Sequence, residues 1–209
     1  MLSLNKPFYT ALLVEFTAFL IIRRFIQYKL IQEKQKATLK SSPLDKALVI
    51  MNSIALFGGT LVYLAKPHWL SWATWPLPTW ARWGGVALGG LGIAGFLWVH
   101  WALGKNWSAW LEIKANQNLV TTGPYQKIRH PMYTTIFLIY FGWALLTANW
   151  FLALTWIGPF ALLTATRVKQ EETMMLETFG ETYSSYMQKT TRFLPKLNFI
   201  KTEQKKSGP

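Results

Sequence analysis

The chain has 209 residues, of which 51% are hydrophobic, and its mean hydropathy of +0.17 lies above the range usual for a soluble domain. Its net charge of +13 would suggest nucleic-acid binding in a soluble protein, but Lys and Arg form no compact stripe with interleaved aromatic residues. The absence of Cys excludes disulfides and thiol chemistry. Composition therefore favours an integral membrane protein.

Apolar segments predict an all-α, polytopic membrane helical bundle of about five transmembrane helices, because a helix needs ~20 residues to cross the hydrocarbon core. The first segment is short and carries Glu15 near its middle, where a charge marks a transport pathway or is paired within the bundle. The predicted segments are residues 8–22, 47–65, 83–104 and 131–166.

The last of these segments has no charge over 36 residues, which suits two short helices joined by a turn. Residues 147–149 are the predicted turn, with Trp150 as an interfacial anchor. Gly158 and Pro159 predict a kink in the second arm. A re-entrant pair that does not cross the bilayer is the alternative to this hairpin.

Small residues in the third segment predict close packing against another helix. Gly85 and Gly89 have the GxxxG spacing, and Gly92 and Gly95 follow. We interpret this pattern as a packing signal without chemistry of its own.

The distribution of Lys and Arg predicts the orientation of the bundle. Of the 22 Lys and Arg residues, all but Lys6, Lys66 and Arg82 lie in segments after the first, third and fifth helices. The positive-inside rule then places the N-terminus outside and the C-terminus in the cytoplasm. The basic tail, residues 196–209, is expected to be disordered near anionic headgroups.

Two of the cytoplasmic segments carry residues that suit chemistry. In the first, Gly123 and Pro124 predict a turn, and Pro131 predicts a helix start with His130 at its N-cap. Such a start favours an anion, and Arg129 and Tyr133 lie beside it. The alternative is that Arg129 snorkels, His130 only caps the helix and Tyr133 is an interfacial aromatic.

The second segment, residues 167–186, predicts a helix that leaves the membrane. Arg167 and Glu171 are four residues apart and share one face, and Gly180 predicts a helix break. The pair could be only a solvated ion pair worth ~0.3 to 0.5 kcal/mol. It would line a cavity if the first segment folds against this helix.

Together the two segments resemble the isoprenylcysteine carboxyl methyltransferases and related phospholipid methyltransferases. The resemblance rests on the run LVTTGPY at 119–125 and on RHPxY at 129–133. It is strengthened by residues after the apolar hairpin, which are Arg167, Glu171, Glu172, Leu176, Phe179, Gly180, Tyr183 and Tyr186.

Membership of this family would imply S-adenosylmethionine as methyl donor and Arg167 as a catalytic, substrate-side residue. The resemblance assigns the cofactor contacts to Gln117, Asn118, Leu119, Val120, Tyr125, His130, Tyr133 and Glu171. Gln117 departs from the eukaryotic enzymes, which have His there, and the contact that matches Trp110 also differs. Glu171, Glu172 and Tyr133 are candidate bases if the acceptor is an amine, whereas a carboxylate acceptor needs none.

The expected organisation is three N-terminal helices over 1–104, a methyltransferase core over 105–195 and the basic tail. The expected activity is methylation of a lipid-like acceptor in a bacterial inner membrane or the endoplasmic reticulum, with a phospholipid amine or a small thiol as alternative acceptors. A non-enzymatic scaffold or a transporter is the alternative from another class. No metal site is predicted, because His68, His100 and His130 are isolated from one another.

Overall fold

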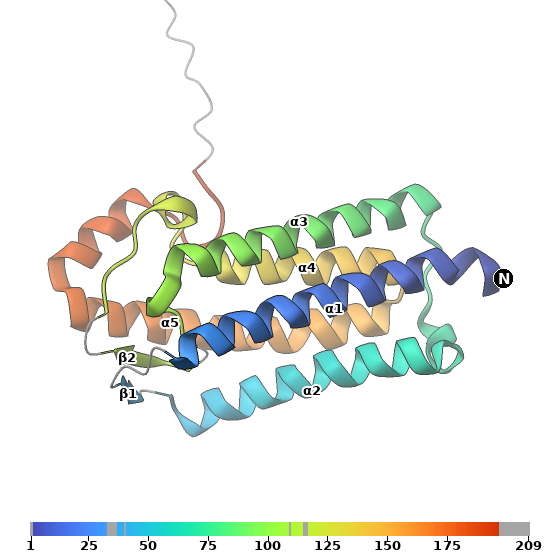
Figure 1. Ribbon diagram of the computed structural model, residues 1–209, viewed down its shortest axis with the longest axis horizontal. Helices are drawn as coiled ribbons and strands as arrows, with labels where there is room; N and C mark the ends of the chain where they lie inside the picture. The colour runs from blue at the N-terminus through green and yellow to red at the C-terminus, as the bar shows by residue number, and fades with distance from the viewer. Residues whose placement is uncertain (1, 33–36, 40, 109, 115–116, 197–209) are drawn as a thin grey trace, which may run out of the picture.

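The structure is a computed structural model that describes residues 2–32, 37–39, 41–108, 110–114 and 117–196. Within these residues, five long helices run along the long axis of the molecule (Figure 1). They are α1 (Leu2–Gln32), α2 (Pro43–Ala65), α3 (Thr79–Leu103), α4 (Pro131–Thr147) and α5 (Trp150–Lys189). The connections contain the 3₁₀ helices η1 (Pro67–Ala73), η2 (Gly104–Asn106) and η3 (Gly123–Gln126), and the strands β1 (Ala37–Leu39) and β2 (Glu112–Lys114).

The predicted all-α membrane bundle is confirmed, with two differences in detail. By length and composition, α2, α3 and α5 can cross a membrane, and α4 is a shorter apolar helix. First, α1 continues to Gln32, ten residues past the predicted end at 22, because Arg and Lys are good helix formers. Second, β1 and β2 form a small antiparallel pair, which was not predicted because strands of three residues show no periodicity. The predicted tail lies outside the described residues, except for Lys196.

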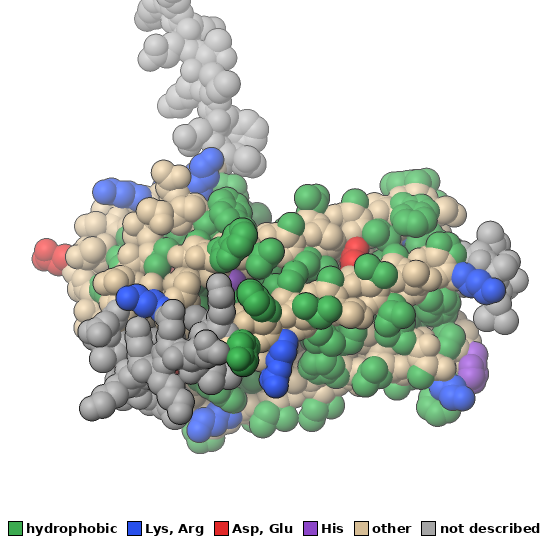
Figure 2. Space-filling view, in the orientation of Figure 1, with side chains coloured by type: hydrophobic (Ala, Val, Ile, Leu, Met, Phe, Trp, Pro, Cys, Tyr) green, Lys and Arg blue, Asp and Glu red, His purple; other side chains and the backbone are tan. Residues whose placement is uncertain are grey.

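The outer faces of the helices are apolar, as lipid contact requires. Figure 2 shows hydrophobic side chains over the middle of the molecule and most Lys and Arg side chains towards its two ends. Ile54, Leu91 and Leu154 are 68%, 67% and 62% exposed. Exposed apolar area on this scale is unusual for a soluble protein and suits a bilayer.

Helices α3 and α4 pack in direct backbone contact at the predicted glycines. A Cβ atom on Gly85 would lie 2.6 Å from the carbonyl oxygen of Gly142, and one on Gly92 would lie 2.8 Å from the backbone nitrogen of Ile139. A Cβ atom on Gly142 would likewise collide with the backbone of Gly89. The GxxxG interpretation is therefore confirmed, and the neighbouring helix is α4.

The turn between α4 and α5 lies at the predicted position. Ala148 ends α4 in the left-handed region at φ 51° and ψ 43°. Asn149 caps α5, since its Oδ1 accepts from the backbone N–H of Leu152 at 3.0 Å. Its Nδ2 donates to the carbonyl of Leu70 in η1 at 2.8 Å. The hairpin thus runs the length of the bundle and is fixed at the end opposite η3.

Glu15 lies inside the bundle rather than facing lipid. Its side chain is 8% exposed, and Trp143 of α4 donates an indole N–H to its Oε2 at 2.7 Å. Gly89 of α3 leaves room for this carboxyl group, because a Cβ atom there would collide with it. Glu15 therefore joins α1 to α3 and α4.

The glycine contact gives a prediction for stability. Gly85→Ala should lower the free energy of unfolding by about 1–3 kcal/mol, because the added methyl group meets backbone atoms that cannot rotate away. Gly90→Ala is the matched control, since nothing lies within 4 Å of its would-be Cβ atom. Thermal unfolding in detergent measures both variants. An equal melting temperature for the two would contradict the direct contact.

Candidate functional site

The loop before α4 is fixed by backbone bonds to the C-terminal segment after α5. Gly123 begins η3 at φ 60°, and Pro131 occupies the first turn of α4 with His130 as N-cap, as predicted. The backbone N–H of Arg129 donates to Thr191 at 2.8 Å, and that of His130 donates to Arg192 at 2.9 Å. The two segments therefore form one unit at this end of the bundle.

Gly180 bends the last part of α5 back over this loop. It is the position inside α5 with non-helical backbone angles, φ 51° and ψ −126°, and Figure 1 shows the chain turning there. Only glycine adopts such a conformation readily. The Tyr186 hydroxyl then donates to the carbonyl oxygen of Tyr125 at 2.6 Å. The predicted helix break at Gly180 is confirmed. A kink was also predicted at Gly158 and Pro159, but the backbone angles of these two residues stay helical.

The carboxylate of Glu172 binds three cationic side chains. It lies 3.1 Å from Arg129 Nε, 3.3 Å from His130 Nε2 and 2.7 Å from Arg192 Nη2. Glu172 is only 5% exposed. A carboxylate buried to this degree is tolerated only when it is paired and hydrogen-bonded.

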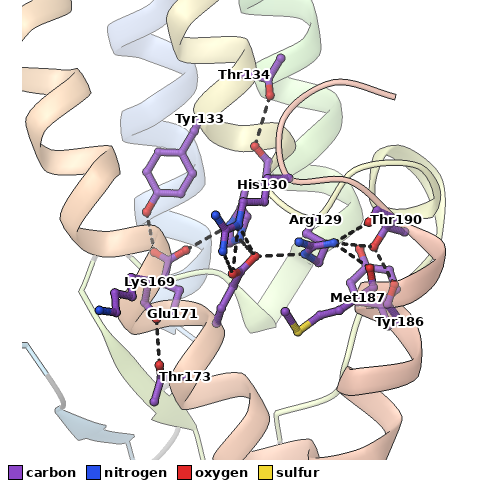
Figure 3. Close-up of polar contacts among 12 residues, drawn as sticks. Arg129, His130, Tyr133, Thr134, Lys169, Glu171, Thr173, Tyr186, Met187 and Thr190 are labelled. Carbon is purple, nitrogen blue, oxygen red and sulfur yellow. Dashed lines mark hydrogen bonds and ion pairs between the residues drawn. The ribbon is translucent and has the colours of Figure 1, made fainter. Parts of the chain in front are cut away.

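Arg129 also holds the end of α5. Its Nη1 donates to the carbonyl oxygens of Met187 at 3.0 Å and Thr190 at 2.5 Å (Figure 3). The guanidinium of Arg129 is thus bound by internal partners, because Glu172 supplies the negative charge and the end of α5 supplies the carbonyl groups. Arg129 acts as a structural clamp between α4 and α5.

His130 lies between two carboxylates, as Figure 3 shows. Its Nδ1 is 3.5 Å from Glu171 and its Nε2 is 3.3 Å from Glu172. Burial lowers the pKa of His130, but hydrogen bonding and charge interaction with Glu171 and Glu172 outweigh this, so the net pKa is raised. The Tyr133 hydroxyl donates to Glu171 Oε1 at 2.6 Å.

One cavity of about 440 Å³ opens beside these groups, within the size range of ligand pockets. All nine predicted site residues line it, which are Gln117, Asn118, Leu119, Val120, Tyr125, His130, Tyr133, Arg167 and Glu171. Trp110 lines it as well. The cavity also continues between the apolar helices, since Phe19 of α1, Val49 of α2 and Phe160 of α5 form part of its wall.

Arg167 pairs with a residue that sequence reasoning missed. Its Nε lies 2.8 Å from Oδ1 of Asp45, which is almost fully buried in the first turn of α2. Arg167 and Glu171, which were predicted to share one face of the helix, both line the cavity. The sequence did not indicate Asp45 as the partner of Arg167, because 122 positions separate the two residues along the chain.

Arg192 was also missed as a partner of Glu172. It lies after α5, in a stretch whose composition resembles any basic tail. Among the residues with described positions, no three His, Cys, Asp or Glu side chains gather as a metal site would require.

This geometry defines an intramembrane protein in which a loop, a helix start and a bent C-terminal helix enclose one cavity. Residues 80–182 match the model of the phospholipid methyltransferase family. The match spans just under half of the chain, so the family is shown as a similarity over that segment. The match begins at the start of α3, upstream of the segment that carries the resemblance in sequence.

A solved structure supports the fold. The eukaryotic intramembrane Ras methyltransferase ICMT, an isoprenylcysteine carboxyl methyltransferase, superposes with a TM-score of 0.52 and 22% identity. The match covers 76% of this chain and 54% of that chain. The predicted fold is thus confirmed, and the match over residues 80–182 agrees with the predicted family resemblance.

Two curated relatives match parts of the chain. The nickel-cobalt-cadmium resistance protein NccN of Alcaligenes xylosoxydans xylosoxydans is 30% identical over 102 residues, which is 48% of this chain and 47% of NccN. The cobalt-zinc-cadmium resistance protein CzcN of Cupriavidus metallidurans is 29% identical over 126 residues, or 59% and 58% of the two chains. The chain spans about half the length of the curated relatives it matches.

Removing the buried carboxylate should destabilise the site end of the bundle. We expect Glu172→Gln to lower the free energy of unfolding by about 3–5 kcal/mol, because the buried Arg129 loses its carboxylate partner. Glu177→Gln, an exposed carboxylate on the same helix, is the control and should change little. Chemical denaturation in detergent tests this, and equal stabilities of the two variants would refute the clamp.

The raised pKa of His130 sets a pH dependence. Protonated His130 stabilises the fold fully below the ordinary histidine pKa of about 6.5, and this contribution is lost as pH rises through the raised pKa. The melting temperature of the wild type should therefore fall from acid towards alkaline pH relative to that of His130→Gln. Parallel melting curves across that range would contradict the two ion pairs.

Proposed function

We propose that the chain is an integral membrane methyltransferase that uses S-adenosylmethionine and acts on a lipid-like acceptor. The observation that carries the proposal is the cavity of about 440 Å³, whose wall contains all nine predicted residues and also side chains of the apolar helices. In such a cavity a soluble cofactor from the aqueous phase could meet an apolar acceptor from the lipid bilayer.

The residues around Glu171 suit the cofactor. S-adenosylmethionine supplies a methyl group on a positively charged sulfur, which leaves as a neutral thioether. Glu171 is partly exposed to the cavity and can accept hydrogen bonds from an ammonium group or ribose hydroxyls. Tyr125 and Tyr133 offer aromatic faces that attract a positive charge. The protein's contribution is mainly to align nucleophile and methyl group.

The residues around Arg167 suit the acceptor. Its guanidinium is oriented by Asp45, so it is held in place at the cavity wall where α5 leaves the bundle. For a carboxylate acceptor, this cation can bind the reacting group and no base is needed. For an amine acceptor, Glu171 with its Tyr133 hydrogen bond is placed to take the proton.

The charge distribution supports a cytoplasmic location for this end of the bundle. Basic residues are concentrated in the segments that flank the site, whereas Lys6, Lys66 and Arg82 are the exceptions in sequence. By the positive-inside rule the C-terminus faces the cytoplasm, where the cofactor is made available.

Glu15 does not favour the transporter alternative. Its carboxyl group accepts a hydrogen bond from Trp143, packs against Gly89, and is not part of the cavity wall. The contacts are those of a buried packing residue, so we retain the enzyme as the proposal.

Cofactor binding is the direct test. Purified protein should bind labelled S-adenosylmethionine in equilibrium dialysis, and Glu171→Ala should weaken binding about ten- to a hundredfold, the equivalent of one charged hydrogen bond. Glu177→Ala is the control, since this residue is exposed on the same helix. The proposal fails if the wild type does not bind the cofactor, or if Glu171→Ala binds it as tightly at an unchanged melting temperature.

A further inference from the structure

Arg23 of α1 lines the same cavity as the predicted cofactor residues, but from a different wall. Phe19, Arg23 and Gln27 are spaced four residues apart, so they form one face of α1, and all three line the cavity. Across from them the cavity is lined by Asn52 and Ser53 of α2. Arg23 is half-buried and interacts electrostatically with groups on α3 and α4, which places its charge on the inner side of α1.

Within the part of the chain that the structure describes, Arg23 differs from the other arginines of the site in having no carboxylate partner. Arg129 and Arg192 bind Glu172, and Arg167 binds Asp45. Among the described residues, the acidic side chains that line the cavity are Glu112 and Glu171, and neither forms an ion pair with Arg23.

No hydrogen bond of Arg23 to another described side chain or carbonyl group is found either. A half-buried guanidinium without a counterion is costly, and an anion in the cavity would offset that cost. The planar fork of donors also matches a phosphate or a carboxylate.

The wall of this cavity also contains apolar side chains beside the polar ones. They include Phe19 of α1, Val49 of α2 and Phe160 of α5. The ligand that fits this wall therefore joins an anionic group to an apolar chain.

We propose that Arg23 binds the anionic group of an amphiphilic acceptor, a phosphate or carboxylate, while the acceptor's chain lies among the apolar residues of α1, α2 and α5. The proposal rests on the proposed methyltransferase function and specifies its acceptor. It assigns to α1, which lies outside the family match of residues 80–182, a role in acceptor recognition.

The test is binding of dodecyl phosphate to the purified full chain in dodecyl maltoside micelles, which carry no charge. Titration calorimetry should show binding to the wild type, weakened about tenfold or more in Arg23→Gln, as expected for the loss of a charge-assisted hydrogen bond. Arg23→Lys keeps the charge and should retain part of the affinity. Arg24→Gln is the matched control, because Arg24 is exposed at the next position of the same helix.

Two further probes separate the contribution of the anionic group to binding from that of the ligand's alkyl chain. Dodecyl glycerol has the chain without the anion, and inorganic phosphate has the anion without the chain. Both should bind at least tenfold more weakly than dodecyl phosphate. The proposal is overturned if either binds as tightly, if the wild type does not bind dodecyl phosphate, or if Arg24→Gln weakens binding as much as Arg23→Gln.

Binding of S-adenosylmethionine to the same variants distinguishes the two proposals. Arg23→Gln should bind the cofactor with wild-type affinity, because the predicted cofactor contacts lie on other elements. A loss of cofactor binding in this variant would count against a role confined to the acceptor. If the wild type binds no cofactor but binds dodecyl phosphate through Arg23, the methyltransferase proposal fails and the anion site stands.

Discussion

The buried carboxylate of Glu172 is the contact on which the site depends. Glu172 comes from α5, Arg129 and His130 come from the start of α4, and Arg192 comes from the segment beyond α5. One acidic group therefore fixes three parts of the chain against one another. Because isolated buried charge is so costly, this arrangement tolerates few alternatives. The neighbouring Glu171 is left partly exposed towards the cavity, held by Tyr133 and His130.

Adjacent carboxylates thus have different environments. Glu172 is enclosed by cations that stabilise its charge, and its contacts are internal. Glu171 has an uncharged hydroxyl partner and a histidine, and it faces the space where a ligand would bind. Two consecutive acidic residues therefore differ in role: Glu172 stabilises the fold, and Glu171 is the one assigned to ligand binding in the proposed function.

Much of this arrangement was predictable from the sequence because the signals are local. The Asn149 turn, the Pro131 helix start and the Gly180 break each depend on the conformational preference of a few adjacent residues. The gathering of the nine site residues followed from the family resemblance. Contacts between distant segments had no such signal. A solvated pair of Arg167 with Glu171 was one of two interpretations of their spacing, whereas the ion pair of Arg167 with Asp45 of α2 had no signal in the sequence. Arg23 was counted only as one of many cytoplasmic cations.

The length of α4 has a consequence for the depth of the site. At ~1.5 Å per residue, its 17 residues extend about 25 Å, which is less than the ~30 Å thickness of the hydrocarbon core. With the Asn149 turn fixed at the opposite interface, the start of α4 falls short of the near headgroups by several ångströms, roughly the mismatch that local bilayer thinning accommodates. The N-cap His130 would then lie closer to the lipid chains than the start of a full-length span does. Under the proposed function, an amphiphile diffusing in the leaflet would reach the cavity without lifting its chain out of the membrane.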